Sequence, residues 1–536
     1  MVLIQQLAIL AICFILFFAL RRALTPKRTG KLPPGPKGKP IIGNLLDLPP
    51  SGHQECVHWL KHKEIYGPIS SVTVLGKTIV LINDRKLANQ ILEKNSAKHS
   101  SRPRLVFADE LSGWGQAPSG QNNTPLLRSY RRAMAKVIGT RASASKFDGL
   151  LEDETRRFAW RVLQTPEKFV DHLRTLITKM TAYESEAGAF ILKITYGYNI
   201  EPHGEDPLVS LADLALQQFS NAIIPGAWLV DMIPALKYIP EWFPGANFKK
   251  IGRQYFDTLT KLVENPLSFT KYQMKEKKER HSFTSSLLNQ GEDESIVKWS
   301  AVALYGGGAD TTVAALEGFF LAMALFPDVQ RKAQEEIDRV FGKPTFPTMA
   351  DREKLPYIEA VAKEALRWHT VANLGVPHRT DEDDIVEGYL IPRDAMLIPN
   401  IWSFNNDPEL YPEPRVFRPE RYIPSDGSDP AIDPADVSFG FGRRICPGRL
   451  IADASLYLTI ANTLAVFDIR KPIGDDGKEM ELPQDFTPGI ISHPIPYKCR
   501  ITPRSEKHRQ LIVDFEKYTP FENSDAGDLE KSLQVN

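Results

Sequence analysis

Eleven consecutive residues, 439–449, constrain the fold of this chain more than any other stretch. They contain three glycines, three arginines and Cys446, and they run directly into the apolar segment 450–466, whose length and composition predict a helix. Cys446 therefore lies where a loop becomes a helix. Unpaired N–H groups, the positive end of the helix dipole and neighbouring arginines all favour a thiolate over a thiol.

The residues around Cys446 indicate a flat, anionic ligand. Gly442 and Gly448 let the backbone lie close to such a group, Phe439 can pack on its face, and Arg444 can bind an acidic group at its edge. We infer haem, with the Cys446 thiolate as the axial iron ligand. Composition alone equally allows a buried cysteine on an ordinary Arg/Gly-rich loop.

The order of these residues, Phe-x-x-Gly-x-Arg-x-Cys-x-Gly, resembles the haem-binding signature of the cytochrome P-450 superfamily in every fixed position. The resemblance covers about residues 32–505. It implies a mainly α fold with a small β-sheet region, haem b as the cofactor, and monooxygenase activity. Within the superfamily, the chain most resembles microsomal fungal enzymes that modify secondary metabolites.

A second motif lies in the long apolar pattern 296–326, which predicts a buried helix. Its middle reads Gly-Gly-Gly-Ala-Asp-Thr-Thr from Gly306, and three glycines in a helix cost roughly 2–3 kcal/mol relative to alanine. We expect a kinked helix over the haem face opposite Cys446, with Thr311 donating a hydrogen bond and Asp310 relaying protons. The alternative is a hinge with a satisfied core carboxylate. The run also resembles the oxygen-activation motif of the same superfamily.

Glu364 and Arg367 are three residues apart on a predicted helix, so they share a face, and their apolar neighbours predict burial. The guanidinium then needs a further partner, for which Pro419-Glu420-Arg421 offers Arg421. The three residues resemble the superfamily's structural triad, and we assign them a structural role.

Two further residues are candidates for binding haem propionates. The resemblance assigns this role to His378 in Pro-His-Arg, although a lone histidine is more often a satisfied surface residue. It assigns the same role to Arg131, the counterpart of the arginine in Trp-x-x-x-Arg. Leu127 replaces the family's tryptophan, which leaves one haem contact in doubt.

The N-terminus differs from the remainder. Residues 2–20 are almost entirely apolar, close to the roughly 20 residues that cross a bilayer, and basic residues follow them. We expect an uncleaved anchor at 1–21 with its N-terminus in the lumen of the endoplasmic reticulum, a basic and proline-rich linker at 22–40, a catalytic domain at 41–505 and a charged tail at 506–536. A cleaved signal peptide is the alternative.

The remaining pattern is mostly helical. Residues 69–82 predict a β-hairpin, 104–125 a long loop, and 224–248 either a surface that dips into the membrane or a packed loop. Four scattered cysteines argue against disulfides or structural zinc, and 66 basic residues balanced by 66 acidic ones give no reason to expect nucleic acid. We expect substrate contacts from 104–125, 304–311, 371–376 and 489–491, whose apolar composition indicates a lipophilic substrate.

No Gly-x-Gly-x-x-Gly follows a predicted strand, so electrons must come from a separate protein. The resemblance implies an NADPH-dependent reductase, with cytochrome b5 as a further donor, docking where Arg443 and Arg449 lie. Alternatives are catabolism of xenobiotics or hydrocarbons by the same chemistry, a dioxygen-independent haem-thiolate isomerase, and a haem sensor. The intact Asp310–Thr311 pair disfavours the last two.

Overall fold

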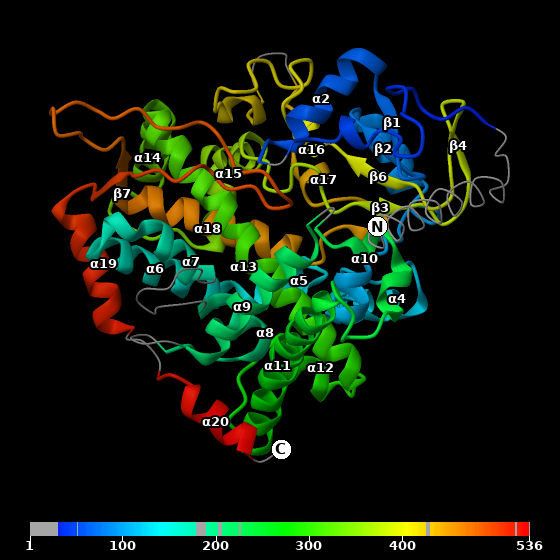
Figure 1. Ribbon diagram of the computed structural model, residues 1–536. Coiled ribbons are helices and arrows are strands. Elements are labelled where there is room, and N and C mark those ends of the chain that lie inside the picture. Colours follow the sequence, from blue (N-terminus) through cyan, green and yellow to red (C-terminus); the bar gives the residue numbers. More distant parts are fainter. Residues whose placement is uncertain are drawn as a thin grey trace.

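The structure, a computed structural model, describes residues 30–50, 52–177, 189–201, 206–224, 227–424, 429–519 and 523–534. Within these residues the chain is mainly helical with small β-sheets, as predicted. The helices form the larger part of the molecule, and the main sheet lies to one side of them with α2 (Figure 1). The predicted anchor at 1–21 lies outside the described residues.

The helices differ widely in length. The longer ones are α2 (Glu55–Tyr66), α4 (Pro125–Ile138), α6 (Asp148–Gln164), α7 (Phe169–Ile177), α8 (Ala189–Tyr196), α9 (Pro207–Ala222), α11 (Asn247–Lys275), α12 (Phe283–Asn289), α13 (Glu294–Leu325), α14 (Pro327–Phe341), α15 (Pro356–Trp368), α18 (Arg449–Val466), α19 (Glu506–Tyr518) and α20 (Ala526–Gln534). Single turns are α3 (Arg85–Ala88), α5 (Arg141–Ala144), α10 (Leu229–Met232), α16 (Ile401–Asn405) and α17 (Ala435–Ser438).

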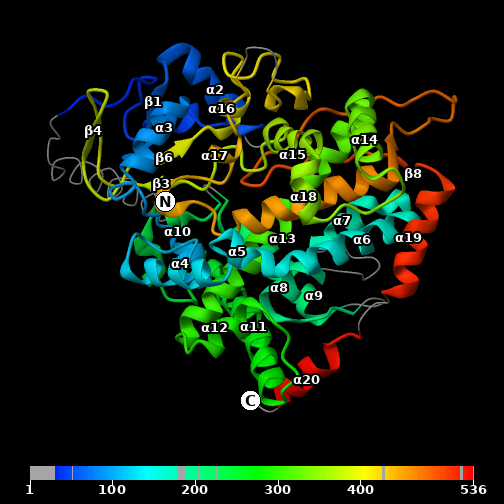
Figure 2. The same cartoon turned by 180° about the vertical axis from the view of Figure 1, so that it is seen from behind.

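The central element is α13, which runs through the middle of the helical body beside α18 (Figures 1 and 2). Asp293 caps its first turn by accepting the N–H of Ile296 at 3.1 Å, and Pro327 begins the next helix. In the described part of the chain, α13 is the one helix long and apolar enough to cross a membrane. Because 72% of its most apolar window is buried against neighbouring helices, it is a core helix.

The main sheet has the strand order β1 (Ile69–Val74), β2 (Lys77–Ile82), β6 (Met396–Pro399), β3 (His378–Arg379). β1 and β2 form the predicted hairpin, whose turn places Leu75 and Gly76 at φ of 48° and 80°. β2 pairs with β6 in parallel, and β3 pairs with β6 antiparallel. Two smaller antiparallel pairs are β4 (Asp384–Val386) with β5 (Tyr389–Ile391), and β7 (Phe467–Arg470) with β8 (Arg500–Pro503).

The loop predicted at 104–125 contains helical turns. A π-helix spans Val106–Leu111 and a 3-10 turn spans Trp114–Gln116. The buried Phe107 ring stacks on Trp228 with centroids 3.5 Å apart, so part of 224–248 is a packed loop. In the same stretch Trp242 and Phe243 are exposed, so only part of 224–248 is packed against the protein.

The charged C-terminal segment is attached to the helical body. α19 packs along α6, and α20 lies along α11 (Figures 1 and 2). Just before α20, the Asp525 carboxylate accepts the Asn199 N–H at 2.7 Å and pairs with Arg280 at 2.6 Å. The composition of the segment did not reveal this docking, because a few buried contacts such as Leu529 suffice for it.

Candidate active site

The cysteine loop joins α17 to α18 and is closed by its own backbone. The Cys446 N–H donates to the Phe439 carbonyl at 2.7 Å, and Gly440 and Gly442 take φ of 78° and 51°, which favour glycine. Phe439 and Cys446 are partly exposed, so both border accessible space.

The two glycines predicted to contact the ligand differ in what they face. A Cβ on Gly442 would lie 2.6 Å from the Leu92 carbonyl oxygen, so this glycine allows close packing against the π-helix Asn89–Lys94, not against a ligand. The Gly442 N–H also donates to the Glu93 carboxylate. A Cβ on Gly448 would meet only Leu304 of α13, at 3.9 Å, so Gly448 borders open space.

Leu304 locates the cysteine loop relative to α13. Leu304, Gly307 and Thr311 share one stripe of the helix because they are three and four residues apart. Gly307 is exposed, and a Cβ on it would touch nothing within 4 Å. In an otherwise buried helix, this stripe therefore faces an accessible space whose other border is the cysteine loop.

The other glycines of α13 serve helix packing. A Cβ on Gly308 would lie 2.8 Å from Ile191 of α8, and one on Gly306 would lie 3.4 Å from Leu216 of α9. The helix is continuous from Glu294 to Leu325, so it has no break at the glycines where a kink was expected. The Thr311 hydroxyl donates to the Gly307 carbonyl at 2.9 Å, within the helix.

Arginine side chains at this site bind backbone carbonyls in place of carboxylates. Arg444 donates to the carbonyls of Ser100 at 2.6 Å, Pro118 at 3.0 Å and Gln121. Burial and, after it, the charge of Arg131 lower the pKa of Arg444 to about 10, although Asp381 acts in the opposite direction. Within the described residues, no carboxylate lies within ion-pair distance of either guanidinium.

A third arginine, Arg102, was not predicted from the sequence. It donates to the carbonyls of Val376 at 2.7 Å and Pro377 at 2.8 Å, and burial together with Arg444 holds its pKa well below its usual range. Three positive charges thus lie close together, and among the described residues no carboxylate is within ion-pair distance of them. Acidic groups on a ligand would relieve their repulsion.

His378, on β3, lies beside these arginines. Its Nδ1 donates to the His99 carbonyl at 2.7 Å, which leaves Nε2 as the nitrogen available to a ligand. Burial first, and then the charges of Arg102 and Arg444, lower the pKa of His378 to about 3. His378 is thus brought to the same cluster as Arg444. Leu127, in the place of the family's tryptophan, is buried in α4.

The Cys446 thiol lies close to Arg131 and Arg449. Burial raises its pKa, whereas the Gly448 N–H and these two guanidinium groups lower it. The net direction is upward, opposite to the prediction, because burial outweighs the favourable contacts. A metal cation bound to a thiol deprotonates it outright, and the same three contacts then help to stabilise the thiolate.

The donor set fits haem. Cys446 offers a sulfur ligand at an accessible surface, Gly448 leaves room beside it, and three arginines without described carboxylate partners match the two propionates of the porphyrin. The carbonyl contacts of Arg102 and Arg444 hold both side chains at the edge of this space.

The predicted structural triad is assembled behind the loop. Arg367 donates to both carboxylate oxygens of Glu364, at 2.7 and 2.8 Å, and Arg421 donates to the same carboxylate at 3.2 Å. Arg367 also donates to the Asn405 carbonyl at 2.9 Å, and the Arg418 N–H donates to Glu364 at 2.8 Å. These bonds fix the coil 405–421 to α15.

Asp310 contacts a residue that no motif indicated. His493 Nε2 lies 3.3 Å from Asp310 Oδ2, and His493 Nδ1 lies 2.9 Å from Glu317 Oε2. His493 was missed because no short-range pattern connects it to α13. Arg102 was missed for the same reason, since its partners Val376 and Pro377 are more than 270 residues away in the sequence.

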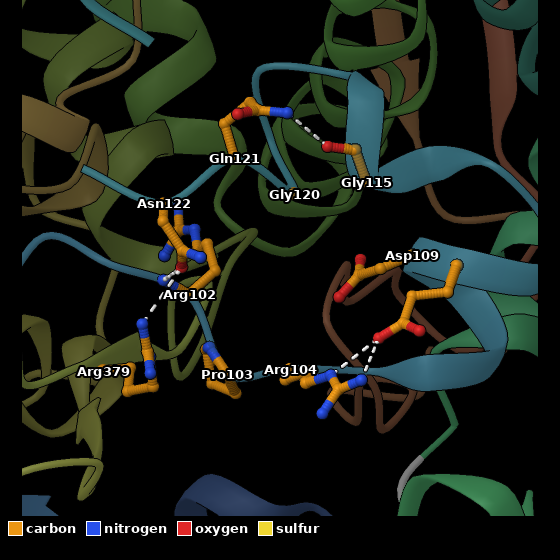
Figure 3. Close-up of a pocket in the computed structure, with 10 residues that line it drawn as sticks. Arg102, Pro103, Arg104, Asp109, Gly115, Gly120, Gln121, Asn122 and Arg379 are labelled. Carbon is orange, nitrogen blue, oxygen red and sulfur yellow. Dashed lines mark hydrogen bonds and ion pairs between the residues drawn. The ribbon is translucent and has the colours of Figure 1, made fainter. Parts of the chain in front are cut away.

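A polar pocket of about 380 Å³ is lined by residues of the segment 102–122 and by Arg379 (Figure 3). In it Arg379 donates to Asn122 Oδ1 at 3.3 Å, and Arg104 pairs with Glu110. The charged lining does not match the apolar contacts predicted for 104–125. The apolar side chains of the segment, such as Phe107, point into the protein instead.

Comparison with known proteins shows the family of the chain. The family model of Cytochrome P450 matches residues 33–501. The chain is 46% identical over 488 residues to cytochrome P450 monooxygenase claR of Ampulloclitocybe clavipes, covering 90% of this chain and 89% of that protein. It is 44% identical to cytochrome P450 monooxygenase ppsD of Aspergillus oryzae, covering 96% and 97%. It is 41% identical to O-methylsterigmatocystin oxidoreductase of Aspergillus flavus, covering 96% of each.

A mainly helical fold with a cysteine loop facing a glycine-bearing helix defines the class of haem-thiolate monooxygenases. The chain belongs to the cytochrome P450 family, and its relatives are fungal monooxygenases. Its cofactor is accordingly iron protoporphyrin with an axial cysteine thiolate.

Proposed function

We propose that this chain inserts one atom of dioxygen into a lipophilic small molecule during fungal secondary metabolism, on a terpenoid, polyketide or alkaloid skeleton. The observation that carries the proposal is that the segments expected to contact the substrate are linked to α13, the helix that faces Cys446, or to a helix packed on it. The name of one relative, O-methylsterigmatocystin oxidoreductase, supports a secondary-metabolite substrate.

The contacts between these segments are specific. Trp114 packs on Phe219 of α9 at 4.5 Å, and Leu216 of the same helix faces Gly306. On the other side the Ser492 N–H donates to the Val371 carbonyl at 2.8 Å. His493, next to Ser492, lies 3.3 Å from Asp310 of α13, so both sets of contacts lead to this helix. Apolar side chains beside it favour a lipophilic substrate.

Within this proposal the polar groups of α13 handle protons. Bound haem iron supplies dioxygen activation, with the thiolate favouring O–O cleavage. The overall reaction takes up two protons and two electrons for each oxygen atom inserted and each water released. Asp310 would carry protons toward the space beside Thr311, whose hydroxyl would turn from the Gly307 carbonyl to donate into that space.

We further propose that an NADPH-dependent flavoprotein reductase docks on the cysteine-loop side, with cytochrome b5 as a second donor. Arg443 and Arg449 are exposed there, and the Arg443 side chain donates to Asn123, just before α4. Arg128 and Arg132 of α4 are also exposed and lie one helical turn apart. This basic surface suits an acidic partner. Reversing both charges of Arg128 and Arg132 should slow electron transfer, whereas Lys507→Glu on α19 should not.

Residence at the endoplasmic reticulum membrane, with a single span at 1–21 and a cytosolic catalytic domain, completes the proposal. Exposed apolar side chains support a membrane-facing surface: Leu229 is 66%, Tyr238 77% and Trp242 81% exposed. The Lys77 ammonium donates to the Asp231 carbonyl at 3.2 Å, which joins this stretch to the β1–β2 turn. Removing residues 1–21 should weaken membrane retention, and adding Trp242→Ser should weaken it further.

Metabolite profiles of the source organism with and without the gene test the function. If the proposal holds, a lipophilic metabolite accumulates that lacks one or more oxygens of the parental product, and the purified enzyme with reductase and NADPH converts it. Unchanged metabolites together with poorer tolerance of, or growth on, foreign lipophiles would favour a catabolic role instead.

A further inference from the structure

The imidazole of His493 bridges two carboxylates of α13. Its Nε2 lies 3.3 Å from Asp310 Oδ2 and its Nδ1 lies 2.9 Å from Glu317 Oε2. Asp310 and Glu317 are seven residues apart, two helical turns, so both project from one face of the helix. Ionised carboxylates only accept hydrogen bonds, and an imidazole offers two N–H donors only when it is protonated. The geometry therefore suits an imidazolium.

The segment that carries His493 is fixed to its surroundings. The His493 N–H donates to the Thr487 hydroxyl at 2.9 Å, and the Thr487 N–H donates to the His493 carbonyl at 2.7 Å. Four residues later, the Tyr497 hydroxyl donates to the Glu317 carbonyl at 2.5 Å. These bonds hold the imidazole in place without fixing its protonation state.

The charged and titratable groups facing His493 come from three directions. Asp310 and Glu317 lie on α13, His369 follows α15, and Tyr497 lies in the same segment as His493. Burial lowers the pKa of His493, but Asp310 and Glu317 raise it to about 9. Burial lowers the pKa of His369 to about 3, so His369 is neutral and adds no competing charge.

Accessibility differs between the two carboxylates. The Asp310 side chain is 30% exposed and His493 20%, whereas Glu317 is only 5% exposed. Asp310 thus lies at the open end of the bridge, next to Thr311, and Glu317 at the closed end. Among the described residues, His493 is the basic side chain within ion-pair distance of Asp310.

We propose that His493 is the residue that positions Asp310 and resupplies its proton, while Glu317 keeps His493 protonated; this rests on the role proposed above for Asp310. The Nε2–H bond of His493 breaks as an O–H bond forms at Asp310 Oδ2. Asp310 passes that proton toward Thr311, and the neutral imidazole is protonated again at Nε2 by a proton from bulk solvent, supplied by hydronium ion or buffer acid. No electron moves in these steps.

The first test is the protonation state of His493 in the ferrous carbon monoxide form of the holoenzyme, which is diamagnetic. Histidine labelled at the ring carbons is titrated by NMR, and His493→Gln assigns the signal. We expect an imidazolium signal that persists to pH 8, and in Glu317→Gln a titration midpoint at least one unit lower. A His493 signal that is neutral at pH 7 in the unmodified enzyme would overturn the proposal.

The second test is the coupling of NADPH oxidation to product. His493→Gln should lower coupling at least fivefold and raise peroxide release, with the haem content, the carbon monoxide spectrum and the substrate KM retained. The alkaline limb of the kcat–pH profile near pH 9 should disappear. Tyr497→Phe is the matched control, because it loosens the same segment from α13 but keeps the charges, and it should stay coupled.

Two outcomes distinguish a wrong role for His493 from a wrong role for Asp310. If Tyr497→Phe uncouples as strongly as His493→Gln, the bridge is only a structural contact and the proposal is wrong. If Asp310→Asn stays fully coupled, the role proposed for Asp310 is wrong, and the resupply of its proton by His493 is overturned with it. The NMR result remains decisive for the protonated bridge even if a variant folds poorly.

Discussion

Arg367 and Glu364 form a two-pronged ion pair at 2.7 and 2.8 Å in which neither side chain has any exposed surface. The pair ties α15 to the coil that leads to the cysteine loop, through the Asn405 carbonyl and the Arg418 N–H. Its effect on the haem site is therefore indirect, through the backbone.

Arg367→Met should strongly destabilise the protein. It leaves Arg421, at 3.2 Å, as the remaining charged partner of the buried Glu364 carboxylate, and breaking a buried pair costs about 3–5 kcal/mol. Thermal unfolding and haem content measure the effect. Arg418→Met is the control, since it removes only an exposed ion pair with Glu413 and keeps the backbone bond to Glu364. Equal melting temperatures for the two variants would contradict a structural role for the buried pair.

Gly442→Ala should disturb the cysteine loop more than Gly440→Ala. Both glycines have positive φ, which costs an alanine about 1–2 kcal/mol. Only at Gly442 would the new Cβ clash with backbone, 2.6 Å from the Leu92 carbonyl oxygen; at Gly440 the nearest atom, the Arg444 carbonyl oxygen, is 3.6 Å away. We expect Gly442→Ala to lose haem during purification and Gly440→Ala to retain most of it. Similar haem occupancy in both variants would show that the loop can move away from Leu92.

Arg102→Gln should weaken haem retention. A charge-assisted hydrogen bond contributes about 1.5–3 kcal/mol, so the rate of haem loss to apomyoglobin should rise about tenfold to hundredfold if Arg102 binds a propionate. Arg104→Gln is the matched control, because Arg104 pairs with Glu110 at the surface. If Arg102→Gln loses haem at the same rate as the control, Arg102 does not bind a propionate and serves only to contact the backbone carbonyls.

Cys446→Ala should abolish the strongly red-shifted carbon monoxide spectrum of the ferrous enzyme, because that spectrum requires a thiolate ligand. Cys56 and Cys499 are buried elsewhere in the fold, so Cys56→Ala and Cys499→Ala should keep it. A red-shifted spectrum in Cys446→Ala would show that another residue binds the iron.

Stability should fall on mild acidification, in part because of His172. Burial lowers the pKa of His172 in the folded protein to about 4, whereas in the unfolded chain it is about 6.5. The unfolded state therefore binds a proton that the folded state does not. The stabilisation is fully present above pH 6.5 and declines as pH falls toward 4, by up to about 1.4 kcal/mol per pH unit. Urea unfolding across this pH range measures how the free energy of unfolding changes with pH. In His172→Gln this dependence should be smaller by the contribution of one proton.

Much of the site could be predicted because its parts are contiguous in the sequence. The cysteine loop, the Gly-Gly-Gly-Ala-Asp-Thr-Thr run and the Glu364–Arg367 pair each lie within one local element, where spacing determines which side chains share a face. The hairpin at 69–82 and the core helix at its predicted place follow from the same short-range patterns.

The purpose of individual residues within those motifs was less predictable. Gly442 was expected to face the ligand, yet it allows close packing on the π-helix Asn89–Lys94. Of the three consecutive glycines 306–308 in α13, Gly306 and Gly308 accommodate α9 and α8, and Gly307 faces open space. A glycine indicates that something lies close or that φ is positive, but the identity of the neighbour depends on the packed fold.

By itself, the sequence determined the family and the mainly helical class, because these depend on local order and periodicity. Only the tertiary structure decided that Arg102 joins Arg444 and His378, that His493 bridges Asp310 and Glu317, and that the charged C-terminal segment packs on α6 and α11. Each of these contacts joins residues that are more than 170 positions apart in the sequence. Asp310 and Glu317, which His493 joins, are themselves only seven residues apart on α13. Such contacts form when the chain packs around its core, and no short-range pattern encodes them.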